Sequence, residues 1–294
     1  MPPPSDRPPA RTELPPLRET IAKYGLGARK ALGQHFLLDI NLTRRIARAA
    51  APLDQGTVIE IGPGPGGLTR GLLQEGARKV IAIEKDSRCL EALREVAAAY
   101  PGRLELIEAD ALEIDISRLG DGPRQIVANL PYNVSTALLI QWLTLIDRDA
   151  SAITRLTLMF QKEVAERLAA VPRSKDYGRL SILAQWLCEI RLLFDVPKQA
   201  FTPPPKVIST IASLKPRSEP LSPAQMPTLE RITAAAFGQR RKMLRQSLKS
   251  TSQDVTGLLA GCAIDETKRA EELTVEEFCA LARAVDEGKT NPGH

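Results

Sequence analysis

Short apolar runs recur along the first two thirds of the chain, and most are followed by a polar or glycine-containing loop and then by a helical pattern. The runs predict strands at residues 57–61, 79–83, 104–108, 125–129, 155–160, 190–196 and 207–214. Strands that alternate with helices are typical of a parallel sheet covered by helices on both faces. The pattern therefore predicts an α/β fold with an open, parallel sheet.

The pattern changes at both ends of the chain. The first 16 residues carry seven prolines, and a segment of this composition forms no core. Proline and serine also crowd residues 215–223, and beyond them the apolar spacing is helical at 224–237, 240–249, 254–259 and 274–285. We expect a disordered leader at 1–16, an α/β domain at 17–214, a linker at 215–223, a small all-helical domain at 224–287 and a disordered tail at 288–294.

Composition narrows the class of protein. Hydrophobic residues make up 43% of the chain and charged residues 26%, which is typical of a soluble globular protein with a core. No apolar run is long enough to span a bilayer, no signal peptide is recognisable, and the four cysteines form no CxxC pair, so we expect reduced thiols, no membrane and a cytoplasmic location. The two histidines argue against a metal site or a Ser-His-Asp triad, whereas the net charge of +5 permits a polyanionic partner.

Distinctive residues follow four successive predicted strands: the glycine run 62–67, Glu84, Asp110 and Asn129. Ligands of open α/β sheets bind outside the carboxyl ends of the strands. The glycines let backbone approach a ligand, and Glu84, 22 residues after Gly62, has the spacing of a carboxylate that binds ribose hydroxyls. Asp110 is placed to accept from an adenine amine. The same glycine run also fits a dinucleotide-binding fingerprint, so a nicotinamide dehydrogenase stays an alternative, as do an ordinary turn and solvated strand ends.

The stretch Asn129-Leu130-Pro131-Tyr132 lies between a predicted strand and a helix that Ser135 or Thr136 is expected to cap. Asn129 offers an amide oxygen, Pro131 stiffens the loop and Tyr132 offers a flat ring. This combination suits a planar nucleobase with an exocyclic amine, because the oxygen accepts from the amine and the ring stacks on the base. An ordinary turn with a core tyrosine is the alternative. A dehydrogenase explains neither this stretch nor the basic C-terminal part.

The segment 238–250 contains five basic residues and no acid. They are Arg240, Arg241, Lys242, Arg245 and Lys249. A helix at 240–249 would place some of them on one face and Leu244 and Leu248 on another, as in a helix that packs on one side and contacts phosphate on the other. A solvated basic face is the alternative, and the lack of neighbouring acids argues against it. Arg29 and Lys30 would extend the basic track.

Seven segments together resemble one family, the rRNA adenine N6-dimethyltransferases, and within it the bacterial enzymes of the small ribosomal subunit. The segments span 33–37, 60–64, 84, 110–111, 129–132, 201–207 and 237–242, and the resemblance covers roughly residues 20–285. It implies a Rossmann-like, seven-stranded sheet and S-adenosyl-L-methionine as cofactor. The cofactor-binding roles that it implies fall on His35, Leu37, Gly62, Glu84, Asp110 and Asn129. The family usually has Asn at position 35 and an acid at position 208, where this chain has His35 and Ile208.

The resemblance also implies the reaction: N6,N6-dimethylation of adenosines, two adjacent ones in a hairpin near the 3′ end of 16S rRNA, by a monomer that acts on the small subunit during ribosome biogenesis. We expect the Asn129 side-chain oxygen and the Leu130 carbonyl to accept the two amine hydrogens, so that positioning and charge neutralisation drive direct transfer. Tyr132 would stack on one face of the base and Phe201 on the other, with core filling as the alternative for Phe201. A large-subunit rRNA methyltransferase of the antibiotic-resistance type and a non-catalytic RNA-binding assembly factor remain the alternative functions.

Overall fold

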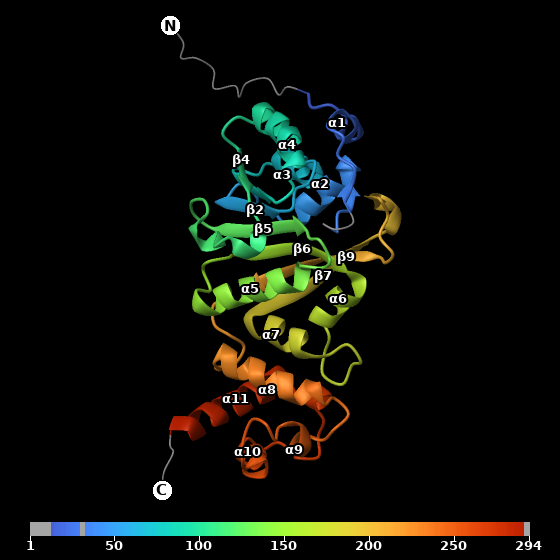
Figure 1. Ribbon diagram of the computed structural model, residues 1–294. Helices are drawn as coiled ribbons and strands as arrows, with labels where there is room; N and C mark the ends of the chain where they lie inside the picture. The colour runs from blue at the N-terminus through green and yellow to red at the C-terminus, as the bar shows by residue number, and fades with distance from the viewer. Residues whose placement is uncertain (1–12, 30–32, 291–294) are drawn as a thin grey trace. The chain divides into compact units, whose positions relative to one another are not determined.

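The structure is a computed structural model that describes residues 13–29 and 33–290, so most of the predicted leader, Lys30 and the last four residues lie outside the description (Figure 1). The strands are β1 (Phe36–Leu37), β2 (Thr57–Ile61), β3 (Val80–Glu84), β4 (Leu104–Glu108), β5 (Arg124–Asn129), β6 (Arg155–Gln161), β7 (Cys188–Val196), β8 (Phe201–Thr202) and β9 (Ser209–Pro216). The α-helices are α1 (Leu17–Lys23), α2 (Ile40–Ala49), α3 (Gly67–Gln74), α4 (Arg88–Ala99), α5 (Ser135–Arg148), α6 (Lys162–Leu168), α7 (Arg179–Leu187), α8 (Met226–Gly238), α9 (Leu244–Ser247), α10 (Val255–Gly261) and α11 (Val275–Thr290). Four short 3-10 helices are η2 (Ala111–Glu113), η3 (Ile116–Arg118), η4 (Lys198–Ala200) and η5 (Ala270–Glu272). The α/β class predicted from the apolar pattern is confirmed.

Seven strands form one sheet in the order β4-β3-β2-β5-β6-β9-β7. β2 pairs with β3 and β3 with β4 in parallel, as predicted. The prediction of parallel strands is wrong for the far edge, where β9 pairs antiparallel with both β6 and β7. A parallel crossover needs a dozen or more residues, usually a helix, and the connection from β7 to β9 holds only η4 and β8.

Two further strands, β1 and β8, form a separate antiparallel ribbon in which Phe36 is opposite Thr202 and Leu37 is opposite Phe201. Each strand has two residues, so neither gives a periodic apolar signal, and the sequence did not predict this pairing. The ribbon joins the segment at 33–37 to the loop at 199–205. These are two of the segments on which the resemblance rests.

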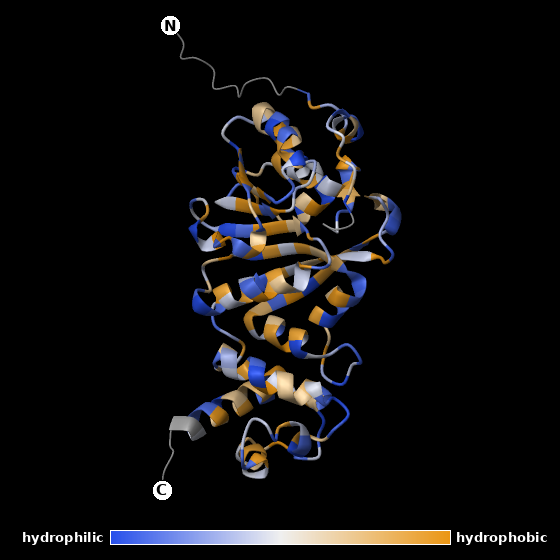
Figure 2. Cartoon of the chain, viewed as in Figure 1, coloured by the Kyte–Doolittle hydropathy of each residue, from blue (hydrophilic) through white to orange (hydrophobic). Residues whose placement is uncertain are grey.

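The contacts of the chain define two compact units. The first comprises residues 1–122, 127–131 and 199–205, and the second comprises 123–126, 132–198 and 206–294. In the first unit β2 and β3 are buried along their whole length, and α2 packs on α3. In the second unit the packing includes α8 against both α7 and α11, with the ring of Phe237 between those of Tyr177 and Phe278. Figure 2 shows many hydrophobic residues on the strands of the sheet.

Three local predictions are corrected by the structure. Neither Ser135 nor Thr136 caps α5: the N-cap is Val134, and the Ser135 hydroxyl donates instead to the Tyr132 carbonyl at 3.1 Å. The helix predicted at 240–249 is reduced to α9, because residues 239–242 form a turn whose Arg240 bonds to distant groups. β9 continues to Pro216, and α11 continues to Thr290, beyond the predicted start of a loose tail.

The division of the sequence into domains stays a prediction. Among the described residues no helix is both long and apolar enough to cross a membrane.

Candidate active site

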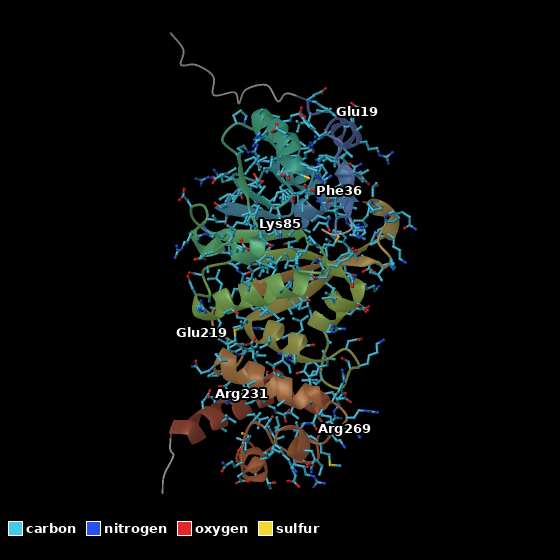
Figure 3. The ribbon with its side chains drawn as sticks, in the orientation of Figure 1. Glu19, Phe36, Lys85, Glu219, Arg231 and Arg269 are labelled. Atoms are coloured by element: carbon cyan, nitrogen blue, oxygen red, sulfur yellow. The ribbon has the colours of Figure 1, made fainter. Side chains whose placement is uncertain are left out.

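The glycine run leaves β2 through a turn that only glycine enters without strain. Gly62, Gly64 and Gly66 have φ of +66°, +55° and +90°, a region that side chains with a Cβ rarely occupy. A Cβ on Gly64 would lie 3.1 Å from the Phe36 ring, which is labelled on β1 in Figure 3. The turn thus brings bare backbone against the ribbon and leads directly into α3.

Glu84 ends β3 beside this turn, as predicted, and the residue is 6% exposed. One carboxylate oxygen accepts from the Gly64 N–H at 2.8 Å and the other from the Asp86 N–H at 2.7 Å. Burial raises the pKa of Glu84, and the backbone donors oppose that rise. Each oxygen keeps a second lone pair, so a carboxylate fixed in this way is still able to accept hydroxyl donors from a ribose.

Glu60 lies two residues before Gly62 and was not among the predicted site residues. Its side chain is buried, and one of its carboxyl oxygens has no hydrogen-bond partner among the described residues. Burial raises its pKa to about 8, and the charge of Glu84 adds to that rise. The group is therefore mostly protonated at neutral pH. An acidic residue at the end of a buried apolar strand is the signal that marks it.

Asp110 follows β4, as predicted, and its two oxygens have separate partners. One accepts from Lys85 Nζ at 2.7 Å and the other from the Leu112 N–H at 3.0 Å, so that Asp110 caps η2. These hydrogen bonds and the Lys85 charge lower the pKa of Asp110. Lys85, labelled in Figure 3, comes directly after Glu84 and links the ends of β3 and β4.

Gln34 connects the segment at 33–37 to the end of β3. Its side-chain amide donates to an Asp86 oxygen at 2.9 Å, while its carbonyl oxygen accepts from the Arg29 N–H at 2.9 Å. Asp86 is 4% exposed and also bonds to Arg88, which lowers its pKa. Sequence reasoning did not assign roles to Gln34 and Asp86. The two lie 52 positions apart, so no local spacing relates them.

Asn129 ends β5 and is half buried. Its side-chain Nδ2 donates to the His35 backbone carbonyl at 3.0 Å. A carbonyl only accepts, so this bond requires the amide nitrogen to face His35 and turns Oδ1 the other way. The structure therefore brings Asn129 and His35 together and presents the Asn129 oxygen as an acceptor, which is the atom that the predicted chemistry needs.

The β1–β8 ribbon holds two more of the predicted residues, Leu37 and Phe201, and His35 directly precedes it. Leu37 is 4% exposed and pairs with Phe201, which is 2% exposed. The Phe201 ring meets the His35 ring edge-on, with centroids 6.4 Å apart and planes at 81°. The His35 Nδ1 lies 2.8 Å from the Pro203 carbonyl oxygen. A base that stacks on Phe201 has to displace the groups that now cover the ring.

The chain passes from the first unit to the second between Pro131 and Tyr132. Leu130 is 2% exposed and lies on the first side of that boundary. On the second side the Tyr132 hydroxyl is hydrogen-bonded to the Ser209 hydroxyl at 2.6 Å, and burial raises the Tyr132 pKa. Ile208, the departure from the usual acid, precedes Ser209 and is 40% exposed.

Comparison with known proteins relates these residues to a family. The model of the family described as "Ribosomal RNA adenine dimethylase" matches residues 25–287. The chain belongs to the ribosomal RNA adenine dimethylase family. It is therefore an enzyme, a methyltransferase that modifies rRNA.

Curated relatives agree. The chain is 66% identical over 273 residues to "Ribosomal RNA small subunit methyltransferase A" of Rhodospirillum rubrum, covering 93% of each chain. It is 64% identical to the protein of the same name in Paramagnetospirillum magneticum, covering 96% of this chain and 98% of the relative. The similarity thus extends over nearly the whole length of both relatives.

Solved structures share the fold. A dimethyladenosine transferase from Plasmodium falciparum superposes with a TM-score of 0.72 at 24% identity, covering 87% of this chain and 98% of that one. The 23S rRNA methyltransferase ErmE superposes with a TM-score of 0.63 at 28% identity, covering 85% of this chain and 99% of that one. The Rossmann-like methyltransferase fold is thus confirmed for this dimethylase.

The basic segment of the dimethylase differs from the prediction. Arg240 donates to Glu271 at 2.7 Å and to the Ser174 carbonyl at 3.2 Å, and Arg245 donates to Glu266 at 3.0 Å. The expectation that no acids compensate this segment is wrong, because the acids are supplied from 21 and 31 positions away. Arg241, Lys242 and Lys249 are exposed, and the described part of the chain offers them no ion pair.

Proposed function

We propose that this dimethylase uses S-adenosyl-L-methionine to convert adenosines of 16S rRNA in the small ribosomal subunit to N6,N6-dimethyladenosine during ribosome biogenesis. The targets are two adjacent adenosines in a hairpin near the 3′ end of that RNA. The observation that carries the proposal is the orientation of Asn129, whose Nδ2 is held by the His35 carbonyl so that Oδ1 serves as an acceptor. A monomer in the cytoplasm is sufficient for this activity.

The cofactor is held at the ends of the parallel strands. The bare backbone of the turn at Gly62 and Gly64 fits a ligand that approaches closely, since a Cβ there would be strained or would press on Phe36. Glu84 binds ribose hydroxyls, and Asp110 accepts from the adenine amine. His35, Leu37 and Asn129 would complete the set of residues that hold the cofactor. S-adenosyl-L-methionine supplies an electrophilic methyl group.

The target base is held by acceptors and rings. Asn129 Oδ1 and the Leu130 carbonyl accept the two hydrogens of the adenine amine, which favours a pyramidal nitrogen with a directed lone pair. No base is needed to deprotonate the amine beforehand. Tyr132 and Phe201 each offer an aromatic ring for stacking on the adenine.

RNA is bound by charge as well as by the base pocket. Arg241, Lys242 and Lys249 are exposed cations that contact phosphates. Arg240 and Arg245 belong to the same surface, but their ion pairs with Glu271 and Glu266 divert them from phosphate. These two arginines therefore contribute more to the structure of the surface than to its affinity for RNA.

Two alternative functions are less well supported than methylation of the small subunit. A large-subunit enzyme is favoured by the likeness to ErmE, but at 28% identity this argument is weaker than the 66% identity to a small-subunit methyltransferase. A non-catalytic assembly factor would not need the oriented amide of Asn129.

The test is methyl transfer from labelled S-adenosyl-L-methionine to unmethylated small subunits, with large subunits in parallel, followed by digestion of the RNA. Dimethyladenosine only in the small subunit supports the proposal. Label in the large subunit instead, or tight binding to the small subunit without label, contradicts it.

A further inference from the structure

His35 is in contact with two of the groups that are proposed to hold the target base, Asn129 and Phe201. Its backbone carbonyl accepts from Asn129 Nδ2 at 3.0 Å, and its ring meets the Phe201 ring edge-on. Its Nδ1 lies 2.8 Å from the Pro203 carbonyl, two residues after Phe201. All of these residues belong to the first unit. One residue therefore joins the end of β5 to the loop that carries Phe201.

The chemistry of the partner fixes the direction of the ring's hydrogen bond. A carbonyl oxygen has no proton to give, so Nδ1 must be the donor to Pro203. In the neutral imidazole the proton then lies on Nδ1, and Nε2 carries the lone pair. The hydrogen bond to Pro203 thus selects one tautomer of His35.

Asparagine is able to make the same bond. The amide nitrogen of Asn and the Nδ1 of His are both two bonds beyond Cβ, so either side chain places an N–H donor at nearly the same point. The resemblance that the sequence carries has Asn as the usual residue at this position. The donor to the Pro203 carbonyl is the property that the two residues share, whereas Nε2 is present only in His.

We propose that His35 is a positioning residue whose Nδ1–H, by holding the Pro203 carbonyl, keeps Phe201 in place relative to Asn129. This inference rests on the proposed function, because it assigns the base to the region between Asn129 and Phe201. The side-chain donor is the property on which the position of Phe201 depends, and Asn also has such a donor.

Two substitutions separate the donor from the ring. H35N keeps an N–H donor and removes Nε2, whereas H35L keeps comparable size and removes both. Neither variant removes the backbone carbonyl that orients Asn129. We expect kcat for H35N within about threefold of the wild-type value and kcat for H35L lower by on the order of 100-fold, since a small misplacement of reacting groups costs that much. The affinity for S-adenosyl-L-methionine, measured by calorimetry, should change little in H35N.

The tautomer is measured without activity. The chain has one other histidine, His294, so H294A labelled with ¹⁵N-histidine leaves His35 as the only imidazole signal. We expect the Nδ1–H tautomer at a pH where the ring is neutral, and normal kcat for H294A. An Nε2–H tautomer overturns the proposal, and so does a kcat for H35N as low as that for H35L.

Thermal unfolding of each variant identifies a folding defect, and H35N is the comparison that remains if H35L does not fold. If the wild-type protein transfers no methyl group to small subunits, the proposed function fails and this inference fails with it. If the wild type is active but H35N is not, only the role of the Nδ1–H donor is wrong.

Discussion

The residues around Asn129 and the basic segment at 240–249 are held in different ways. Around Asn129 the hydrogen bonds run between side chains and backbone: Asn129 to the His35 carbonyl, His35 to the Pro203 carbonyl and the Gly64 N–H to Glu84. In the basic segment the bonds of Arg240 and Arg245 run mainly to carboxylates of Glu271 and Glu266, and the side chains of these two arginines are 36% and 43% exposed.

This difference matches what each region has to do. A backbone partner moves only with its strand or loop, so the hydrogen bonds around Asn129 restrict the side chains that are proposed to position a reacting amine. Exposed ion pairs contribute little stability and are screened by salt, so the basic segment can rearrange around phosphates. Substitutions around Asn129 should therefore act through the positions of the reacting atoms, and substitutions in the basic segment should act through charge.

The largest expected effect is the loss of the Asn129 side chain. N129A removes the acceptor for the amine, and we expect the rate of methyl transfer to fall at least about 100-fold, as it does when one preorganised polar group is removed from other enzymes. Asn129 is only one of several residues proposed to hold the cofactor, so cofactor affinity should fall much less than the rate. The exposed Asn133 offers a matched control, N133A, with near-normal activity. Most of the activity surviving in N129A would remove this residue from the mechanism.

The next effect tests the packing beneath the site. A Cβ on Gly67 would lie 2.4 Å from the Leu37 carbonyl oxygen, a backbone atom, so G67A must shift β1 or α3. We expect a loss of about 1–3 kcal/mol in the free energy of unfolding and weaker cofactor binding. The matched control is G27A, where a Cβ meets nothing within 4 Å. Equal unfolding free energies for the two variants would show that this contact is not tight.

Glu60 makes the stability of the folded protein depend on pH. Its pKa rises from 4.5 to about 8 on folding, so the folded protein holds a proton that the unfolded chain has lost between these values. Wild-type stability should therefore fall as pH rises from 4.5 towards 8, by up to about 1.4 kcal/mol per pH unit from this group. The E60Q side chain does not titrate, so this variant lacks the pH-dependent contribution of Glu60. Chemical denaturation across this range should show its stability gaining on the wild type with rising pH; parallel curves would contradict the assignment.

The smallest expected effects distinguish an arginine that binds RNA, Arg241, from one that forms an ion pair within the protein, Arg240. R241A should weaken RNA binding and lower its salt dependence by about one counterion, with unfolding unchanged. R240A removes bonds to Glu271 and to the Ser174 carbonyl, so it should cost about 1 kcal/mol of stability and affect RNA binding less. Salt titrations of RNA binding, paired with unfolding curves, distinguish the two. The opposite pattern would mean that Arg240 contacts phosphate and Arg241 is structural.

How well a feature can be predicted from the sequence depends on how far apart along the chain the residues that form it lie. The strand ends at Gly62, Glu84, Asp110 and Asn129 were predictable because each is a local change from an apolar run to a polar or glycine residue. The bonds of His35 to Pro203 and of Arg240 to Glu271 join residues 168 and 31 positions apart. No spacing within one element records them, so only the folded chain reveals them.

The same reasoning explains the error at 240–249. The apolar stripe was real, since Leu244 and Leu248 are fully buried. The helix was not formed along the whole segment, because Arg240 reaches Glu271 and the Leu244 N–H donates to the Lys268 carbonyl. Tertiary partners replaced the local hydrogen bonds that a helix would have used.

The role of Asn129 is best tested by a crystal structure of the protein with S-adenosyl-L-methionine, or its demethylated product, and an RNA fragment containing the target adenosine. We expect the adenine N6 within about 3 Å of both Asn129 Oδ1 and the Leu130 carbonyl oxygen, with Asn129 Nδ2 still on the His35 carbonyl. An adenine bound elsewhere, or an Asn129 amide turned with its nitrogen towards the base, would contradict it.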